Sequence, residues 1–275
     1  MGLIDRLKKE AVDKGIVIQD TNAFELERIL NKTFYYSKDV EGEVDFIRHI
    51  MTRGLETQER KGLHASSIIV KDSEWCTRQH VLSLIYKQLQ GDEVPIGLKR
   101  IFEEGNSIHE KWQRLFIRAG FSTYDQLDAT QFNKKYRVSY TPDIICTIPE
   151  FFDGPMIGEV KSVNSRQFDK MEKHPSAGKQ LQWYMYLRGI HKGFVLNDNK
   201  NNQQFRLEIY DYNPKVVEPF IDRCEQIKYY YNRLIKEKKM IARPSGCKSI
   251  KSRLCSKCNM QEACWNIGSG RVKLE

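Results

Sequence analysis

Three cysteines near the C-terminus, Cys255, Cys258 and Cys264, follow the pattern C-x-x-C-x5-C and limit how this part of the chain can fold. The N-terminus, MGLIDRLKKEAVDKG, mixes acidic and basic residues before any apolar stretch and is therefore unlike an export signal. In a reducing compartment, clustered thiols more often bind a metal than form disulfides. We therefore expect a cytoplasmic protein, in the host cytoplasm if it is viral, whose C-terminal segment folds around a metal centre.

Two other cysteines are candidates for the fourth ligand of this centre. Cys247 lies eight residues before Cys255 and would complete a local zinc knuckle. Cys76 is remote in sequence, and a site that used it would join the start of the domain to its end. Cys146 and Cys224 fall on apolar faces and are predicted to be core residues. The spacing leaves both Cys76 and Cys247 open.

The hydrophobic pattern predicts an α/β or α+β domain in which helices come first and strands follow. Of the 275 residues, 40% are hydrophobic and 29% are charged, enough for one large domain, or one domain with an extension. Helical spacing is found in residues 3–54, 77–90, 97–119, 176–187 and 217–234. Apolar runs predict strands at 135–148, 156–163, 194–196 and 205–209, with a turn in the FFDGP of 151–155. Asn213 and Pro214 predict the start of the last long helix, which should end before Pro244.

Carboxylates and a lysine follow one another on two of the predicted strands. Asp143 comes directly after a proline, and Glu159 and Lys161 form an E-x-K triplet sixteen residues later. If the two strands pair as a hairpin, Asp143 and Glu159 meet at one end of the sheet and form a hard oxygen site suited to magnesium or manganese. Lys161 projects from the same face as Glu159. This combination suits metal-assisted phosphodiester hydrolysis, although each residue alone is commonplace at a strand end.

Three further residues fit either a functional or a structural role. His109 lies in a predicted helix, where a histidine is more often a surface or core residue than a ligand. Gln180 and Tyr184 are four residues apart and share one helix face, from which an amide and a phenol could contact a phosphate or a base. They could equally be an ordinary surface pair.

The charge distribution favours a polyanionic partner. The chain has 45 Lys and Arg against 36 Asp and Glu, a net charge of +9, and residues 225–275 alone have 12 against 4. A local basic field most often attracts nucleic acid, and the alternative is a solvated basic tail. No run of 18 apolar residues is present, so we expect no membrane partner.

Taken in chain order, these features resemble the RecB-like nucleases of the PD-(D/E)XK superfamily. The resemblance is to the iron–sulfur branch that includes the CRISPR-associated adaptation exonucleases and the AddB nuclease domain. It covers residues 66–265 and rests on six short motifs, namely C-x-R (Cys76, Arg78), G-x-x-x-H (Gly105, His109), an aspartate after proline (Asp143), E-x-K (Glu159, Lys161), Q-x-x-x-Y (Gln180, Tyr184) and C-x-x-C-x5-C (Cys255, Cys258, Cys264).

The resemblance implies a fold and a set of ligands. The fold would be a restriction-endonuclease-like core, a central mixed sheet flanked by helices, with a helical N-terminal extension over 1–60 and a nuclease domain over 61–275 closed by the cysteine segment 247–265. One or two magnesium or manganese ions would be bound by His109, Asp143, Glu159 and the Val160 carbonyl. Lys161 would be catalytic. A 4Fe–4S cluster, with zinc as the alternative occupant, would be held by Cys76, Cys255, Cys258 and Cys264.

The function implied is a metal-dependent DNA exonuclease that acts on single-stranded DNA or DNA ends. It would serve recombination or repair, phage replication or CRISPR adaptation, with the cluster in a structural role. Gln180, Tyr184 and Arg78 would contact DNA. A different class of function is a DNA-binding accessory subunit without catalysis. A third is a nuclease that works only with a protein partner bound through residues 1–60.

Overall fold

The fold is described from a computed structural model that covers residues 21–36, 40–53, 62–86, 96–127 and 130–267. The predicted helical residues 3–20 lie outside these ranges. Within the described ranges, no helix combines the length and the apolar character needed to cross a membrane.

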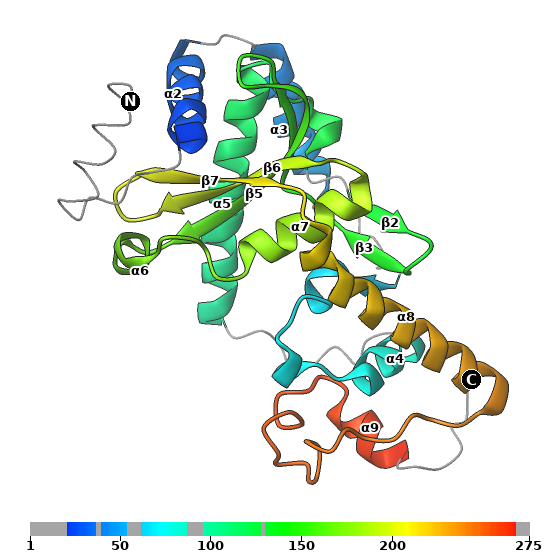
Figure 1. Cartoon of the computed structure of the whole chain (residues 1–275). Helices are drawn as coiled ribbons and strands as arrows, with labels where there is room; N and C mark the ends of the chain where they lie inside the picture. The colour runs from blue at the N-terminus through cyan, green and yellow to red at the C-terminus, as the bar shows by residue number, and fades with distance from the viewer. Residues whose placement is uncertain (1–20, 37–39, 54–61, 87–95, 128–129, 268–275) are drawn as a thin grey trace, which may run out of the picture.

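A four-stranded mixed sheet forms the centre of the molecule (Figure 1). Its strands lie in the order β4 (Ile144–Ile148), β5 (Phe152–Val163), β6 (Lys192–Asn199) and β7 (Phe205–Asp211). β5 is antiparallel to β4 and parallel to β6, and β7 is antiparallel to β6. The parallel pair requires a crossover connection, which is supplied by α6 (Ser165–Lys170) and α7 (Ala177–Arg188).

Helices cover both faces of this sheet. α5 (Ile96–Arg118) packs on one face, where Trp112 and Phe116 contact a buried cluster that includes Phe194. α7 packs on the other face, between the sheet and the neighbouring helix α8 (Pro214–Glu237). Its buried residues, most of which are apolar, contact both. The predicted α/β core, a central mixed sheet flanked by helices, is confirmed.

The helices of the predicted N-terminal extension share this core. α2 (Thr21–Tyr36) buries Leu26 and Leu30 in the same cluster as Trp112, and α3 (Val40–Arg53) contributes Phe46. Glu27 of α2 accepts a hydrogen bond of 2.8 Å from the backbone N–H of Leu207 in β7. This carboxylate satisfies a donor on the edge strand of the sheet, so α2 packs as part of the same core as the central sheet.

A second, smaller sheet has β1 (Leu63–His64), β3 (Val138–Tyr140) and β2 (Gln131–Asn133), in that order. Residues 135–148 were predicted as one strand, but they form β3 of this sheet and β4 of the central sheet, separated by residues 141–143. The apolar run is continuous because both strands are buried, and this conceals the break. The predicted turn at 151–155 is also displaced. The turn covers 149–151, and β5 begins at Phe152 and includes Gly154, which adopts a φ of +156° within the strand.

The C-terminal part of the chain returns to an early helix. α8 begins at Pro214 with Asn213 as its N-cap and ends before Pro244, as predicted. Beyond it, the segment up to α9 (Gln261–Ile267) lies under α4 (Thr77–Ile85) and α8 at one end of the molecule (Figure 1). Residues that are far apart in the sequence therefore meet at this end.

Candidate active site and thiol group

β5 presents two kinds of side chain to the two faces of the sheet. Met156 and Val160 point to the α5 face, while Ile157 points to the α7 face. Because side chains alternate along a strand, Glu159 and Lys161 lie on the α7 face with Ile157. Gly158, between them, has no room for a side chain because an added Cβ would lie 2.5 Å from the ring of Phe194. The strand can therefore pack closely on the α5 face and present its charged residues on the other.

Asp143 lies at the same end of the sheet as Glu159, as the hairpin prediction requires. Ile144 is paired with Gly158 in the antiparallel ladder, which places Asp143 opposite Glu159. The Asp143 carboxylate accepts a hydrogen bond of 2.8 Å from the Val160 N–H. Its backbone carbonyl accepts another, also of 2.8 Å, from the amide of Gln113 on α5. These two bonds fix the aspartate within the turn between β3 and β4.

His109 reaches this carboxylate from α5. Its Nδ1 lies 3.3 Å from Oδ1 of Asp143. Burial by itself lowers the pKa of His109, but the hydrogen bond and negative charge of Asp143, together with the charge of Glu159, raise it overall. Burial by itself raises the pKa of Asp143, and the hydrogen bond and charge of His109 with the charge of Lys161 lower it overall. Both shifts favour the charged forms of the pair.

Glu159 has a buried carboxyl whose pKa is raised. Its side chain is 2% exposed, and burial followed by the charge of Asp143 raises its pKa to about 7. One of its oxygens, Oε1, is paired with Nζ of Lys161. The other, Oε2, is buried without a hydrogen-bond partner among the described residues. A buried carboxylate oxygen with no partner is unusual in a purely structural role.

Gln180 and Tyr184 of α7 contact the lysine. The Lys161 ammonium donates to Oε1 of Gln180 at 3.4 Å, and the Gln180 amide donates to the Tyr184 hydroxyl at 3.1 Å. Tyr184 is 1% exposed, so its contacts are with the protein. Burial by itself lowers the pKa of Lys161, but the charges of Glu159 and Asp143 raise it overall. Gln180 and Tyr184 thus form a chain of hydrogen bonds that ends at the lysine, and their contact with DNA stays a prediction.

A polar layer behind Lys161 was missed by the sequence analysis. Asn197 of β6 is paired with Lys161 in the parallel ladder, and its amide donates to Glu208 of β7 at 2.7 Å. Glu208 also accepts hydrogen bonds from the Tyr210 hydroxyl at 2.6 Å and from the backbone N–H of His174 at 2.7 Å. The available signal was the polar triplet at 197–199, directly after an apolar strand core.

The side chains at this end of the sheet suit a divalent cation by their chemistry. Asp143 and Glu159 supply hard oxygen ligands, the Oε2 of Glu159 has no partner, and His109 supplies a nitrogen. In the structure these groups are bonded to one another, and no set of three His, Cys, Asp or Glu side chains in the described ranges has the arrangement of a metal site. A cation would therefore displace the contacts of His109 and Lys161.

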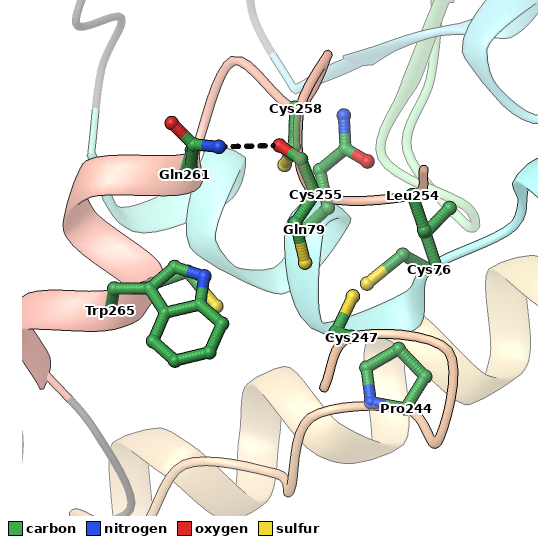
Figure 2. Close-up of a pocket in the computed structure, with 10 residues that line it drawn as sticks. Cys76, Gln79, Pro244, Cys247, Leu254, Cys255, Cys258, Gln261 and Trp265 are labelled. Atoms are coloured by element: carbon green, nitrogen blue, oxygen red, sulfur yellow. Dashed lines mark hydrogen bonds between the residues drawn. The ribbon is translucent and has the colours of Figure 1, made fainter. Parts of the chain in front are cut away.

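Five thiols gather at the other end of the molecule. Cys76, at the start of α4, lines one pocket with Cys247, Cys255, Cys258 and Cys264 (Figure 2). The sulfur atoms of Cys76 and Cys247 point toward one another. Both candidates for the fourth ligand are therefore present, and Cys146 and Cys224 are buried elsewhere, in the two core clusters.

Arg78 stabilises this thiol group. Its side chain is 1% exposed, and its guanidinium donates to the Cys264 sulfur at 3.0 Å, to the Cys264 carbonyl at 3.1 Å and to the Ile241 carbonyl. All these contacts join α4 to the C-terminal segment. Arg78 was predicted to contact DNA, but the structure places it inside the protein with no exposed surface for such a contact.

The five thiols could supply thiolate sulfur ligands, which favour zinc and iron–sulfur clusters. Burial raises the pKa of Cys76, and it raises the pKa of Cys258 to about 11. These thiols would lose their protons on binding a metal. The cavity between them is about 10 Å³, room for about one water. No three of these thiols have the arrangement of a metal site among the described residues, so the side chains would have to move to bind either zinc or a 4Fe–4S cluster, and further for the larger cluster.

Comparisons with known proteins give only distant likenesses. No family model matches the chain, and no curated protein matches it by sequence. An alkaline exonuclease from Laribacter hongkongensis, solved with dAMP, is 13% identical over 65% of this chain and 91% of that chain, with a TM-score of 0.48. A phage-related exonuclease from Haemophilus somnus is 13% identical over 64% of this chain and 96% of that chain, with a TM-score of 0.43. The protein SSO0001 is 13% identical over 88% and 96%, with a TM-score of 0.42. At these values, the function has to be inferred from the chain's own side chains.

Proposed function

We propose that the protein is a divalent-metal-dependent DNA exonuclease that acts on single-stranded DNA or DNA ends and carries a structural 4Fe–4S cluster. The observation that supports it most is the meeting of His109, Asp143, Glu159 and Lys161 at one end of the sheet, with Oε2 of Glu159 buried and without a partner among the described residues. Recombination or repair, phage replication and CRISPR adaptation are the settings that such an enzyme would serve.

Each residue of the site has a distinct task in hydrolysis. A bound magnesium or manganese ion would supply a Lewis acid that activates water and offsets negative charge on the phosphate. Asp143 and Glu159 would hold it, with His109 as a nitrogen ligand and the Val160 carbonyl as the further oxygen ligand implied by the resemblance. Lys161, held by Gln180, would place its ammonium against the charge that develops on the phosphate oxygens.

The remaining parts of the proposal concern the cluster and the partners. Cys76, Cys255, Cys258 and Cys264 would hold the cluster, which would fasten α4 to the C-terminal segment, with zinc as the alternative occupant. The basic C-terminal region, residues 225–275, has 12 basic and 4 acidic residues, and its net positive charge would attract the DNA backbone. A protein partner could bind through residues 1–60, outside the parts of α2 and α3 that are buried in the core.

The experiment that tests the function is a cleavage assay with protein purified without oxygen. Single-stranded and double-stranded DNA, labelled at the 5′ or the 3′ end, is incubated with manganese, with magnesium or with EDTA. We expect metal-dependent degradation by the unmodified protein and none by an Asp143→Ala preparation, because that carboxylate is a proposed metal ligand. DNA binding without cleavage by either protein would favour the accessory subunit.

Metal affinity is expected to increase with pH up to about 7. Burial and the charge of Asp143 raise the pKa of Glu159 to about 7, so its carboxyl is protonated below this pH and charged above it. Only the charged form binds a cation well. Because Glu159 releases one proton, the affinity for manganese should fall about tenfold for each pH unit below this value. His109, whose pKa is also raised, has to lose its proton to serve as a nitrogen ligand, which makes the fall steeper. Calorimetric titration with manganese checks this, and Glu159→Gln should make the pH dependence less steep, leaving the part that is due to His109. An affinity that stays constant on both sides of pH 7 would contradict it.

A further inference from the structure

A second cavity lies beside the candidate active site, at the carboxyl end of β5. Its volume is about 750 Å³, within the range of about 300 to 1,000 Å³ that is usual for ligand sites. It is lined by residues between Asn164 and Pro175, which belong to α6 and to the segment that joins α6 to α7. None of these residues has a role in the function proposed above.

The lining is basic. Arg166, Lys170 and Lys173 are exposed, and Glu172 is the one acidic residue among those that line the cavity. None of the three cations forms an ion pair with a carboxylate within the described ranges. Three cations around one open cavity suit a ligand with more than one negative group, such as consecutive phosphates of a nucleic-acid strand.

The backbone of this cavity is fixed on the central sheet. The guanidinium of Arg206 in β7 donates to the Met171 carbonyl at 2.6 Å and lies over the buried ring of Phe168, 4.6 Å from its centroid. The His174 N–H donates to the Glu208 carboxylate at 2.7 Å. The cavity therefore keeps its shape without a ligand, which lowers the ordering cost of binding.

The cavity is also close to Lys161. Asn164 follows Lys161 by three residues, a separation of about 10 Å along an extended strand. His174 lies between two lining residues, Lys173 and Pro175, and burial, then the charge of Lys161, lower its pKa. That influence requires the ammonium to be near. A strand whose phosphate contacts Lys161 would have its neighbouring nucleotides at the cavity.

We propose that this cavity binds backbone phosphates of the DNA strand next to the scissile bond, through Arg166, Lys170 and Lys173. The inference rests on the proposed function for the position of the cut bond, but binding in the cavity does not require cleavage. Contacts to phosphates alone are independent of base sequence. The cavity would therefore bind single-stranded DNA of any sequence.

The test compares DNA binding in EDTA, where no cleavage takes place. We expect Arg166→Gln/Lys170→Gln/Lys173→Gln to bind single-stranded oligonucleotides more weakly, and by the same factor for unrelated sequences. The slope of log affinity against log salt concentration should decrease by about 2, at about 0.7 for each lost phosphate contact. Fluorescence anisotropy over a series of salt concentrations measures both, and Lys170→Gln alone should lower the slope by about 0.7.

A matched variant controls for charge. Arg28→Gln/Lys32→Gln/Lys134→Gln also removes one arginine and two lysines from exposed positions, on α2 and after β2, and should bind DNA nearly as the unmodified chain does. Equal affinities and salt slopes for the two triple variants would overturn the proposal, as would a failure of the unmodified chain to bind DNA. The cleavage assay decides the nuclease activity separately, since the cavity is tested by binding alone.

Discussion

Lys161→Ala is expected to lower metal-dependent DNA cleavage by about 10²- to 10³-fold, the usual effect of removing a group that stabilises transition-state charge. The ammonium lies between Glu159 and Gln180, where it would face the phosphate. The positive charge of Lys161 lowers the pKa of Glu159, so removal of the ammonium raises that pKa and favours the protonated carboxyl. The fold should therefore persist, because a protonated Glu159 leaves no unpaired charge in the core.

The same pKa effect gives the variant a second defect, which the assay has to separate. A protonated Glu159 binds metal less tightly, so cleavage is measured at saturating manganese, where a defect in metal binding alone would disappear. Lys192→Ala is the matched control, since Lys192 is also paired with a carboxylate, Asp211 at 2.7 Å, at the far edge of the sheet. Cleavage at the unmodified rate by Lys161→Ala would show that the lysine has no part in the chemistry.

The hairpin that brings the carboxylates together could be predicted from the sequence. Asp143 directly precedes an apolar run and Glu159 lies within another, and strands that are close in sequence usually pair. Because side chains alternate along a strand, the E-x-K spacing placed Lys161 beside Glu159. Local pattern was sufficient here because the pairing is local.

Contacts between distant segments could not be predicted in this way. Arg78 bonds residues that are 163 and 186 positions further along the chain, so its burial depends on the path of the C-terminal segment. The polar layer of Asn197 and Glu208 depends on the register between β6 and β7. The burial of Tyr184 could not be predicted for a similar reason, since its helix face is covered by the small sheet, where its ring lies 5.9 Å from that of Tyr140.

We expect Cys258→Ala to lose the bound metal, and with it the brown colour of an iron–sulfur protein, and to loosen the C-terminal segment. The hydrophobic residues buried in the segment after α8 are few, namely Met240, Cys247, Cys255, Met260 and Ala263. Structural metal sites contribute on the order of 10 kcal/mol to folding, far more than so small an apolar core. Iron and zinc analysis, visible absorbance and the rate of trypsin cleavage at the basic residues of 248–257 measure these effects.

Variants of the other cysteines identify the metal and its ligands. Cys146→Ala, at a buried thiol in a different part of the core, should keep the metal. If Cys76 completes an iron–sulfur cluster, Cys76→Ala loses the colour and Cys247→Ala keeps it. A colourless protein with stoichiometric zinc that is lost in Cys247→Ala and kept in Cys76→Ala would instead establish the local knuckle. In that case Arg78, which donates to Cys264 and to the Ile241 carbonyl, would be the main polar link between α4 and the end of the chain.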